Sequence, residues 1–338
     1  MIYTGGTIGM REDPVTHALV PFDFDHLIDN IPKIGNLGYE LGNVQFEQPI
    51  DSSNMNPRHW AKIVKAVADN YDRYDGFVVL HGTDTMAYTA SALSFMLESL
   101  DKPVVVTRSQ LPIGNIREDG TENLITALMI AAAKEEKTNK PIVQEVVISF
   151  ENYLIRGNRA TKKSSTNFNA FKSYNYPLLG TMDMHLVFNK DYLLRPTVDR
   201  PLTPHYAMDS SVAVLWLFPG ISEIAVRTQL MMPGIKAVVL RTFGSGNAPT
   251  EKWFLDVISD AVKKGIIIIN VTQCSNGGEE HNLYYTGDML AKTGVISGRD
   301  ITCEAALTKL MYLLGLGLDN DHIIECLGKN IVGEVTVS

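Results

Sequence analysis

Residues 77–85 read Phe-Val-Val-Leu-His-Gly-Thr-Asp-Thr and join a short apolar run to a polar turn. Residues 77–80 are apolar at every position, which is typical of a strand covered on both faces of its sheet. The turn, residues 81–85, places a hydroxyl beside a carboxylate and leads into a helix-period segment from about Ala87. This order predicts one strand-and-helix unit of an α/β fold, with polar side chains at the exit of a buried strand.

The same alternation continues along the chain. Runs rich in β-branched residues alternate with segments of helical periodicity, and this order predicts parallel sheet with crossover helices. The strand-like runs are residues 77–80, 104–107, 146–150, 212–217, 237–241 and 266–271. The helix-like segments are residues 57–69, 87–99, 122–134, 223–231 and 251–263, followed by two amphipathic helices at about 303–314 and 320–329.

The length of the chain predicts two domains. With 338 residues it exceeds one ordinary hydrophobic core and suits two domains of roughly 100 to 200 residues each. Residues 174–211 are rich in proline, aspartate and tyrosine, and a new strand and helix alternation begins at Val212. We therefore predict an N-terminal domain over residues 1–190, a linker over 191–211 and a C-terminal domain over 212–338.

Composition narrows the class of protein. An apolar fraction of 45% and a charged fraction of 20% are typical of a folded globular chain. The net charge of -8 without a basic cluster argues against nucleic acid as a partner. Membrane insertion and export are not expected, because no apolar run reaches the roughly 18 residues of a span and no signal-peptide pattern opens the chain. Three cysteines without metal-ligand spacing suit free thiols in the cytoplasm.

The first polar segment of interest is residues 4–9, Thr-Gly-Gly-Thr-Ile-Gly, after a very short opening strand. The shortness suggests that a longer first strand has been trimmed. Glycines let backbone amides approach a ligand closely. The segment fits neither the dinucleotide fingerprint nor the P-loop pattern. A tight structural turn is an equally good interpretation of these residues taken alone.

The turn at residues 81–85 has two structural alternatives. Asp84 or Thr85 could serve only to cap the following helix, because both residue types accept hydrogen bonds from its free amides. His81 has no second histidine at metal-ligand spacing, so a structural role is favoured over a metal site.

Two further polar segments flank the predicted elements. Residues 51–54, Asp-Ser-Ser-Asn, could be a turn and helix cap, and Lys162 within residues 156–163 could be solvated surface. The alternative interpretation of these polar segments is that their side chains take part in catalysis. A threonine hydroxyl is a poor nucleophile until a base removes its proton, and a desolvated lysine oriented by a carboxylate can do so. The residues thus permit a relay of hydroxyl, lysine and carboxylate, without metal or cofactor.

Residues 4–9 and 81–85 together resemble the two signatures of the asparaginase and glutaminase family. The cytoplasmic type I asparaginases are resembled more closely still, and the likeness runs almost end to end. It is carried further by residues 50–53, 156–162, 243–247 and 270–274. The resemblance implies a larger N-terminal domain with a flavodoxin-like mixed sheet, a smaller C-terminal α/β domain with a parallel sheet, and a homodimer or homotetramer.

The resemblance also implies a reaction, the hydrolysis of L-asparagine to L-aspartate and ammonia through a β-aspartyl acyl-enzyme. Thr7 matches the nucleophile of the family, while Thr83, Lys162 and Asp84 match its proton relay. The implied substrate-binding residues are Gly6, Asp51, Ser52, Ser53, Thr83, Asp84 and Asn247. Of these, Ser52 and Asp84 match the groups that hold the α-carboxylate and α-amino ends of the substrate, and Asn247 matches a residue that approaches the site of a neighbouring subunit.

A second, regulatory asparagine site is implied by Thr161, Arg241 and Cys274, which fall at the matching positions of type I enzymes. Local packing around a strand-end arginine is an equal alternative for these residues.

The chain departs from the family in two places. No tyrosine stands in residues 13–21, where many relatives have one near the nucleophile, and Tyr312 could replace it only if the fold brings it near; a core aromatic is the favoured alternative. Arg108 stands where relatives generally have glycine, and would add strain of about 1 kcal/mol or more if that position has a positive φ. Arg108 could attract a carboxylate or obstruct the pocket.

Several rival functions remain open at this point. A glutaminase or broader amidase would share the chemistry and accept a substrate side chain longer by one methylene. Discrimination by one methylene is typically worth only about 1 to 3 kcal/mol. The ammonia-releasing subunit of a tRNA-dependent amidotransferase is disfavoured by the absence of basic patches. An asparagine-binding sensor with weak catalysis is the rival from another class. A nucleotide enzyme fits poorly, because residues 244–249 end in proline where the fingerprint needs glycine or alanine.

Overall fold

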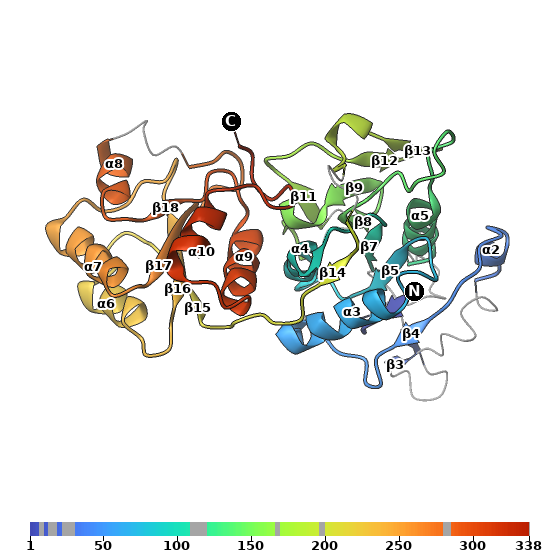
Figure 1. Cartoon of the computed structure of the whole chain (residues 1–338), viewed down its shortest axis with the longest axis horizontal. Coiled ribbons are helices and arrows are strands. Elements are labelled where there is room, and N and C mark those ends of the chain that lie inside the picture. The colour runs from blue at the N-terminus through green and yellow to red at the C-terminus, as the bar shows by residue number, and fades with distance from the viewer. Residues whose placement is uncertain are drawn as a thin grey trace. The chain divides into compact units, whose positions relative to one another are not determined.

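The computed structural model describes residues 1–6, 10–12, 19–21, 31–108, 120–165, 170–195, 200–279 and 285–337. The chain forms two compact units (Figure 1). The first unit comprises Met1–Ser173 and Pro177–Tyr206, and the second comprises Tyr174–Tyr176 and Ala207–Ser338. No helix among the described residues is long and apolar enough to cross a membrane.

The first unit is built on a mixed sheet of eight strands among the described residues. In spatial order these are β13 (Leu186–Phe188), β12 (Gly180–Met182), β9 (Tyr153–Arg156), β8 (Val146–Phe150), β7 (Val104–Thr107), β5 (Phe77–Leu80), β1 (Ile2–Tyr3) and β4 (Val44–Gln45). From β8 to β4 neighbouring strands run parallel, whereas β9, β12 and β13 pair antiparallel. The predicted mixed sheet is confirmed.

The longer helices of this unit among the described residues are α3 (Pro57–Asp69), α4 (Met86–Met96) and α5 (Gly120–Ala132). Helix α5 packs against β5, β7 and β8, and α4 packs against β8 and α3. Every residue of β5, β7 and β8 is buried, as their largely apolar sequences predict. Helix α4 ends before the predicted residue 99, because β6 (Leu97–Glu98) pairs with β14 (Thr203–Pro204).

Short elements complete the first unit. They are β2 (Met10–Glu12), β3 (Leu19–Pro21), α2 (Pro32–Gly35), η3 (Ser52–Asn54), η4 (Gly157–Arg159), β10 (Ala160–Lys162), β11 (Phe171–Ser173) and η5 (Lys190–Tyr192). The hairpin of β10 and β11 matters for the site, because Lys162 pairs with Phe171 at the end of it.

The second unit has a parallel sheet in the order β15 (Val212–Trp216), β16 (Ala237–Thr242), β17 (Ile267–Thr272) and β18 (Ile296–Ser297). Its helices among the described residues are α6 (Glu223–Leu230), α7 (Lys252–Lys263), α8 (Tyr285–Ala291), α9 (Cys303–Gly315) and α10 (Asn320–Leu327). A smaller parallel-sheet unit is therefore confirmed as well.

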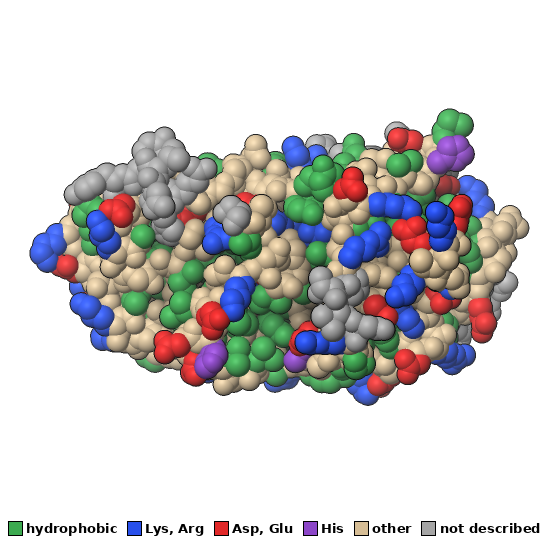
Figure 2. All heavy atoms as spheres, turned by 45° about the horizontal axis from the view of Figure 1, so that its top comes forward, with side chains coloured by type: hydrophobic (Ala, Val, Ile, Leu, Met, Phe, Trp, Pro, Cys, Tyr) green, Lys and Arg blue, Asp and Glu red, His purple; other side chains and the backbone are tan. Residues whose placement is uncertain are grey.

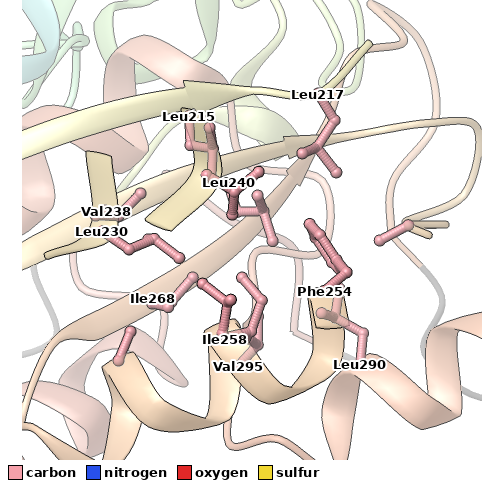
Figure 3. Close-up of a cluster of buried hydrophobic side chains, with 14 of the residues drawn as sticks. Leu215, Leu217, Leu230, Val238, Leu240, Phe254, Ile258, Ile268, Leu290 and Val295 are labelled. Carbon is pink, nitrogen blue, oxygen red and sulfur yellow. The ribbon is translucent and has the colours of Figure 1, made fainter. Parts of the chain in front are cut away.

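One core of the second unit lies between this sheet and helices α6 and α7 (Figure 3). Leu240 and Ile268 of the sheet meet Leu230 of α6 and Phe254 of α7, and all four are at most 1% exposed. Side chains alternate between the two faces of a strand, so the buried Val239 of β16 points to the face opposite Leu240. Helix α9 packs against β15, β16 and β17 of the same sheet.

The surface carries charge of both signs. On the face drawn in Figure 2, lysine and arginine side chains are interspersed with aspartate and glutamate. That face does not present one continuous field of positive charge.

Candidate active site

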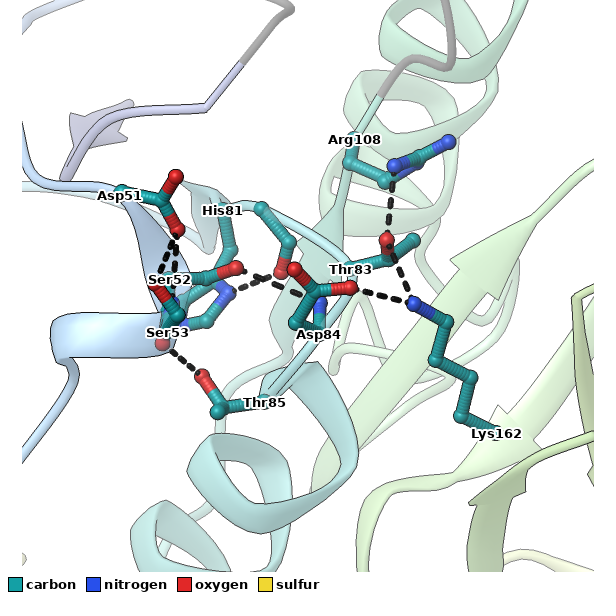
Figure 4. A network of polar contacts seen from close by, with 10 residues as sticks. Asp51, Ser52, Ser53, His81, Thr83, Asp84, Thr85, Arg108 and Lys162 are labelled. Carbon is teal, nitrogen blue, oxygen red and sulfur yellow. Dashed lines mark hydrogen bonds and ion pairs between the residues drawn. The ribbon is translucent and has the colours of Figure 1, made fainter. Parts of the chain in front are cut away.

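The candidate site lies where three neighbouring parallel strands of the first unit end. The sheet order places β5 between β1 and β7. The turns that follow them begin at Thr4, His81 and Arg108, so they meet at one edge of the sheet. Figure 4 shows His81 and Arg108 at this edge. This edge is where ligands of open α/β sheets collect.

The turn after β1 requires its glycines. Gly5 has φ 137° and Gly6 has φ 88°, conformations that side chains rarely adopt. A Cβ atom on Gly5 would overlap the carbonyl of Ile50, and one on Gly6 would lie 2.9 Å from the amide nitrogen of Gly82. Gly5 thus lets the first turn lie against Ile50, and Gly6 lets it lie against the turn after β5. Thr7, the predicted nucleophile, lies outside the described residues.

The hydroxyl and the carboxylate in the turn after β5, those of Thr83 and Asp84, meet the amine of Lys162 from β10. Lys162 Nζ lies 3.1 Å from Thr83 Oγ1 and 2.5 Å from Asp84 Oδ1. Thr83 is buried, the Lys162 side chain is 22% exposed and the Asp84 side chain is 59% exposed. Strand β10 therefore brings Lys162 to Thr83 and Asp84 across 78 positions of sequence, and the three candidates lie together (Figure 4).

Residues 51–54 form the wall beside this cluster. Ser52 is buried, its Oγ accepts a hydrogen bond from the amide of Asp84 at 3.2 Å, and its carbonyl accepts one from Thr85 Oγ1 at 2.7 Å. Asp51 caps η3 by accepting from the amide and hydroxyl of Ser53, both at 2.8 Å. These bonds from Ser53, the backbone one foremost, lower the pKa of Asp51.

Capping does not explain the polar residues before α4. Thr85 stands at the N-cap position, yet no side-chain bond caps that helix. Its hydroxyl instead binds the Ser52 carbonyl, and the Asp84 carboxylate binds Lys162. The capping alternative for Asp84 and Thr85 is therefore wrong.

His81 belongs to a buried chain of hydrogen bonds. Trp60 Nε1 donates to Thr89 Oγ1 at 2.9 Å, and Thr89 Oγ1 lies 2.8 Å from His81 Nε2. A carbonyl oxygen only accepts, so the Gly82 carbonyl, 2.5 Å from Nδ1, places the single proton of a neutral His81 on Nδ1, and Nε2 then accepts from the Thr89 hydroxyl. Burial lowers the pKa of His81 to about 4. His81 is thus a neutral structural residue that holds the turn before Thr83.

Arg108 enters the same cluster from the end of β7. It is only 7% exposed, and its Nη1 donates to Thr83 Oγ1 at 2.9 Å. It is not among the described residues that have a positive φ, so the strain expected for a glycine-like position does not arise. No group of three or more histidine, cysteine or acidic side chains that could hold a metal ion occurs among the described residues.

The remaining candidates are divided between the units. Thr161 lies on β10 of the first unit, whereas Arg241, Asn247 and Cys274 lie in the second. Arg241 is buried with its guanidinium 5.0 Å from the ring centre of Trp216, and Cys274 is exposed.

Asn247 closes a turn after β16, where its amide donates to the carbonyl of Phe243 at 2.8 Å. Tyr312 is buried on α9, the core position favoured from the sequence.

The sequence left three members of the first-unit network unassigned. Trp60 and Thr89 lie inside helices α3 and α4 and carry no local signal of their contact with His81. Arg108 was noticeable only as a departure from the glycine of relatives.

Fold and cluster together define a two-domain α/β protein with a hydroxyl, lysine and carboxylate group at the carboxyl edge of its main sheet. Residues 1–193 match the family model described as "Asparaginase, N-terminal", and residues 211–327 match "Glutaminase/Asparaginase C-terminal domain". The chain belongs to the asparaginase and glutaminase family, as the two signatures predict.

Individual relatives are similar along the whole chain. L-asparaginase 1 of Escherichia coli (strain K12) is 43% identical over 335 residues, which cover 99% of this chain and 96% of that protein. The 60 kDa lysophospholipase of Mus musculus is 39% identical over 99% of this chain and 62% of its own length. The crystal structure of L-asparaginase I from Vibrio cholerae matches with a TM-score of 0.89 and 38% identity, and covers 99% of this chain and 98% of that one.

Proposed function

We propose that this chain is an L-asparaginase, which hydrolyses L-asparagine to L-aspartate and ammonia. The observation that carries the proposal is the group formed by Thr83 Oγ1, Lys162 Nζ and the Asp84 carboxylate, with contacts of 3.1 and 2.5 Å, directly beside the Gly6 turn. Amide hydrolysis requires a group that moves protons close to a nucleophile, and this cluster supplies one. The family membership and the full-length similarity to proteins named L-asparaginase support the same reaction.

In the proposed reaction Thr7 attacks the side-chain amide carbon of asparagine, ammonia leaves, and water hydrolyses the β-aspartyl ester. Thr83 and Lys162 carry the protons. The backbone amides of Gly6 and Thr83 are proposed to stabilise the oxyanion, an interaction worth roughly 3 to 4 kcal/mol per donor in a measured case.

The ends of the substrate are assigned to residues at the same edge. Ser52 Oγ accepts from the Asp84 amide and retains its own proton, which suits a bond to the α-carboxylate. The exposed carboxylate of Asp84 suits the α-ammonium group. Asp51 and Ser53, which are exposed beside them, are proposed to line the entrance.

The catalytic assignment is tested by Thr7→Ala and Lys162→Met. Removal of a nucleophile or of a proton-transfer group costs at least about 100-fold in kcat. Lys65→Met is the matched control, because Lys65 pairs only with Asp69 on the exposed side of α3 among the contacts described. Near-native turnover by Thr7→Ala would show that another residue is the nucleophile.

Self-association is proposed as a homodimer or homotetramer, with Asn247 reaching the site of a neighbouring subunit. Exposed apolar side chains of the second unit support it, since Trp216, Phe218 and Ile224 are 54%, 52% and 75% exposed. Size-exclusion chromatography with light scattering tests the assembly.

Regulation by a second asparagine molecule is proposed for Thr161, Arg241 and Cys274. Its test is the shape of the velocity curve, because hyperbolic kinetics without activation by asparagine would exclude the regulatory site.

A reducing compartment, the cytoplasm, is proposed because all three cysteines are free.

A further inference from the structure

Arg108 is fixed at three points inside the first unit. Its carbonyl accepts a hydrogen bond from Asn123 Nδ2 at 3.0 Å, and its guanidinium carbon lies 5.6 Å from the ring centre of Phe150. Its Nη1 donates to Thr83 Oγ1 at 2.9 Å, and the residue is 7% exposed. An arginine held in this way is not a solvated surface residue, and its guanidinium is directed at the hydroxyl of the proposed relay (Figure 4).

The Thr83 hydroxyl therefore meets two cationic side chains. Lys162 Nζ lies 3.1 Å from the same oxygen that accepts from Arg108. A hydroxyl has two lone pairs and one proton, and arginine never gives up its protons in a protein. Arg108 consequently occupies one lone pair of Thr83 in every protonation state. Thr83 therefore keeps one proton and one lone pair for two remaining hydrogen bonds. One of these bonds points toward Lys162, and the other points away from both cations.

We propose that Arg108 is a positioning residue that makes the Thr83 hydroxyl a two-ended proton relay between Lys162 and the reacting groups. The inference rests on the proposed function. In one direction Thr83 gives its proton to the Lys162 amine as its oxygen receives a proton from the attacking hydroxyl or water. In the other direction the Lys162 ammonium returns a proton to Thr83 as Thr83 gives its own to the leaving amine. One proton enters and one leaves Thr83 each time, and Arg108 stays protonated throughout.

The loss of Arg108 has a specific kinetic consequence. Without Arg108, the proton of the Thr83 hydroxyl can also rotate to the position that Arg108 had filled, where it does not serve the relay. Negative charge that develops on the Thr83 oxygen also loses one of its two charged donors. Arg108 acts through Thr83 and does not contact the substrate in this account, so kcat is affected and KM is not. This separates the proposal from the view that arginine here obstructs the pocket or captures a substrate carboxylate.

The test compares the native protein with Arg108→Met and Arg108→Lys. Methionine keeps an apolar stem against Phe150 without a donor, whereas lysine keeps a cationic donor. We expect Arg108→Met to lower kcat about 10- to 100-fold with KM within about twofold, and Arg108→Lys to recover part of that loss. Lys102→Met is the control, since Lys102 precedes the same strand and donates to the carbonyls of Tyr71 and Tyr74.

Melting temperatures are compared first, and Arg108→Leu replaces Arg108→Met should the methionine variant not fold. The proposal is overturned if a folded apolar variant has a native or higher kcat. It is also overturned if the kcat of Arg108→Lys is no higher than that of the folded apolar variant. Failure of the proposed function can be distinguished from failure of the Arg108 proposal alone. In the first case the native protein itself releases no ammonia from L-asparagine, which also contradicts the relay.

Discussion

Replacing Thr89 by valine removes one hydroxyl from the buried hydrogen-bond chain behind the 81–84 turn. Thr89 and His81 are both 0% exposed and Trp60 is 6% exposed, so water cannot replace the lost partner. Valine has the same shape but neither accepts from the indole nor donates to the imidazole, which leaves one donor and one acceptor unsatisfied. Each buried orphan costs about 1 to 3 kcal/mol. Thr89→Val is therefore expected to lower the free energy of unfolding by about 2 to 6 kcal/mol.

Urea unfolding at neutral pH, followed by circular dichroism, measures this change. Ser94→Ala is the control on the same helix, because Ser94 Oγ only donates back to the carbonyl of Ala90 at 2.8 Å and its loss should cost less than about 1 kcal/mol. Adding Trp60→Phe to Thr89→Val removes the orphan donor, so the double variant should lose less stability than the two single variants together. A cost for Thr89→Val below about 1 kcal/mol would refute the hydrogen-bond chain.

Three further predictions concern pH and buried groups. The pKa of His81 falls from 6.5 unfolded to about 4 folded, so the unfolded state binds more protons between these values and the native protein should lose about 3 kcal/mol as pH falls through this window; His81→Asn, compared by urea unfolding at pH 7 and pH 4, should lack that loss. Lys309→Met removes the cation that lies 2.7 Å from the Glu334 carboxylate, with both side chains 0% exposed. Glu334 keeps its hydrogen bonds from the amides of Ile331 and Val332 but becomes a buried charge without Lys309, which should cost about 3 to 5 kcal/mol; an unchanged melting temperature would contradict this. Gly6→Ala, at φ 88° and 2.9 Å from the Gly82 nitrogen, should lower kcat at least about tenfold because the turn must move, and native turnover would disprove the close approach.

Much of the fold could be predicted because its central strands contain runs of at least three consecutive apolar residues. Strands β5 and β16 are buried at every residue. Strand β5 is apolar throughout and β16 is apolar over residues 237–240, as burial on both faces of a sheet selects. The antiparallel strands β12 and β13 were not predicted. They contain exposed residues such as Val187 at 55%, and their pattern is too short to distinguish from a loop.

The site could be predicted only in part. Its residue types pointed to a hydroxyl, lysine and carboxylate relay, but only the family resemblance joined Lys162 to residues 81–85, because β10 brings them together across a long separation. The bond from Thr85 to the Ser52 carbonyl replaces a helix cap that the local sequence suggested. Arg108 was read as a departure, and only its buried side chain gives it a partner in Thr83.

The most direct test of the account is ammonia release by the purified native protein with L-asparagine, in parallel with L-glutamine, over a wide substrate range. The account predicts turnover of L-asparagine in preference to L-glutamine, with a sigmoidal curve if the second site operates. Equal or greater turnover of L-glutamine would make the protein a glutaminase or a broader amidase. Binding of L-asparagine without ammonia release would contradict the central claim and identify a sensor.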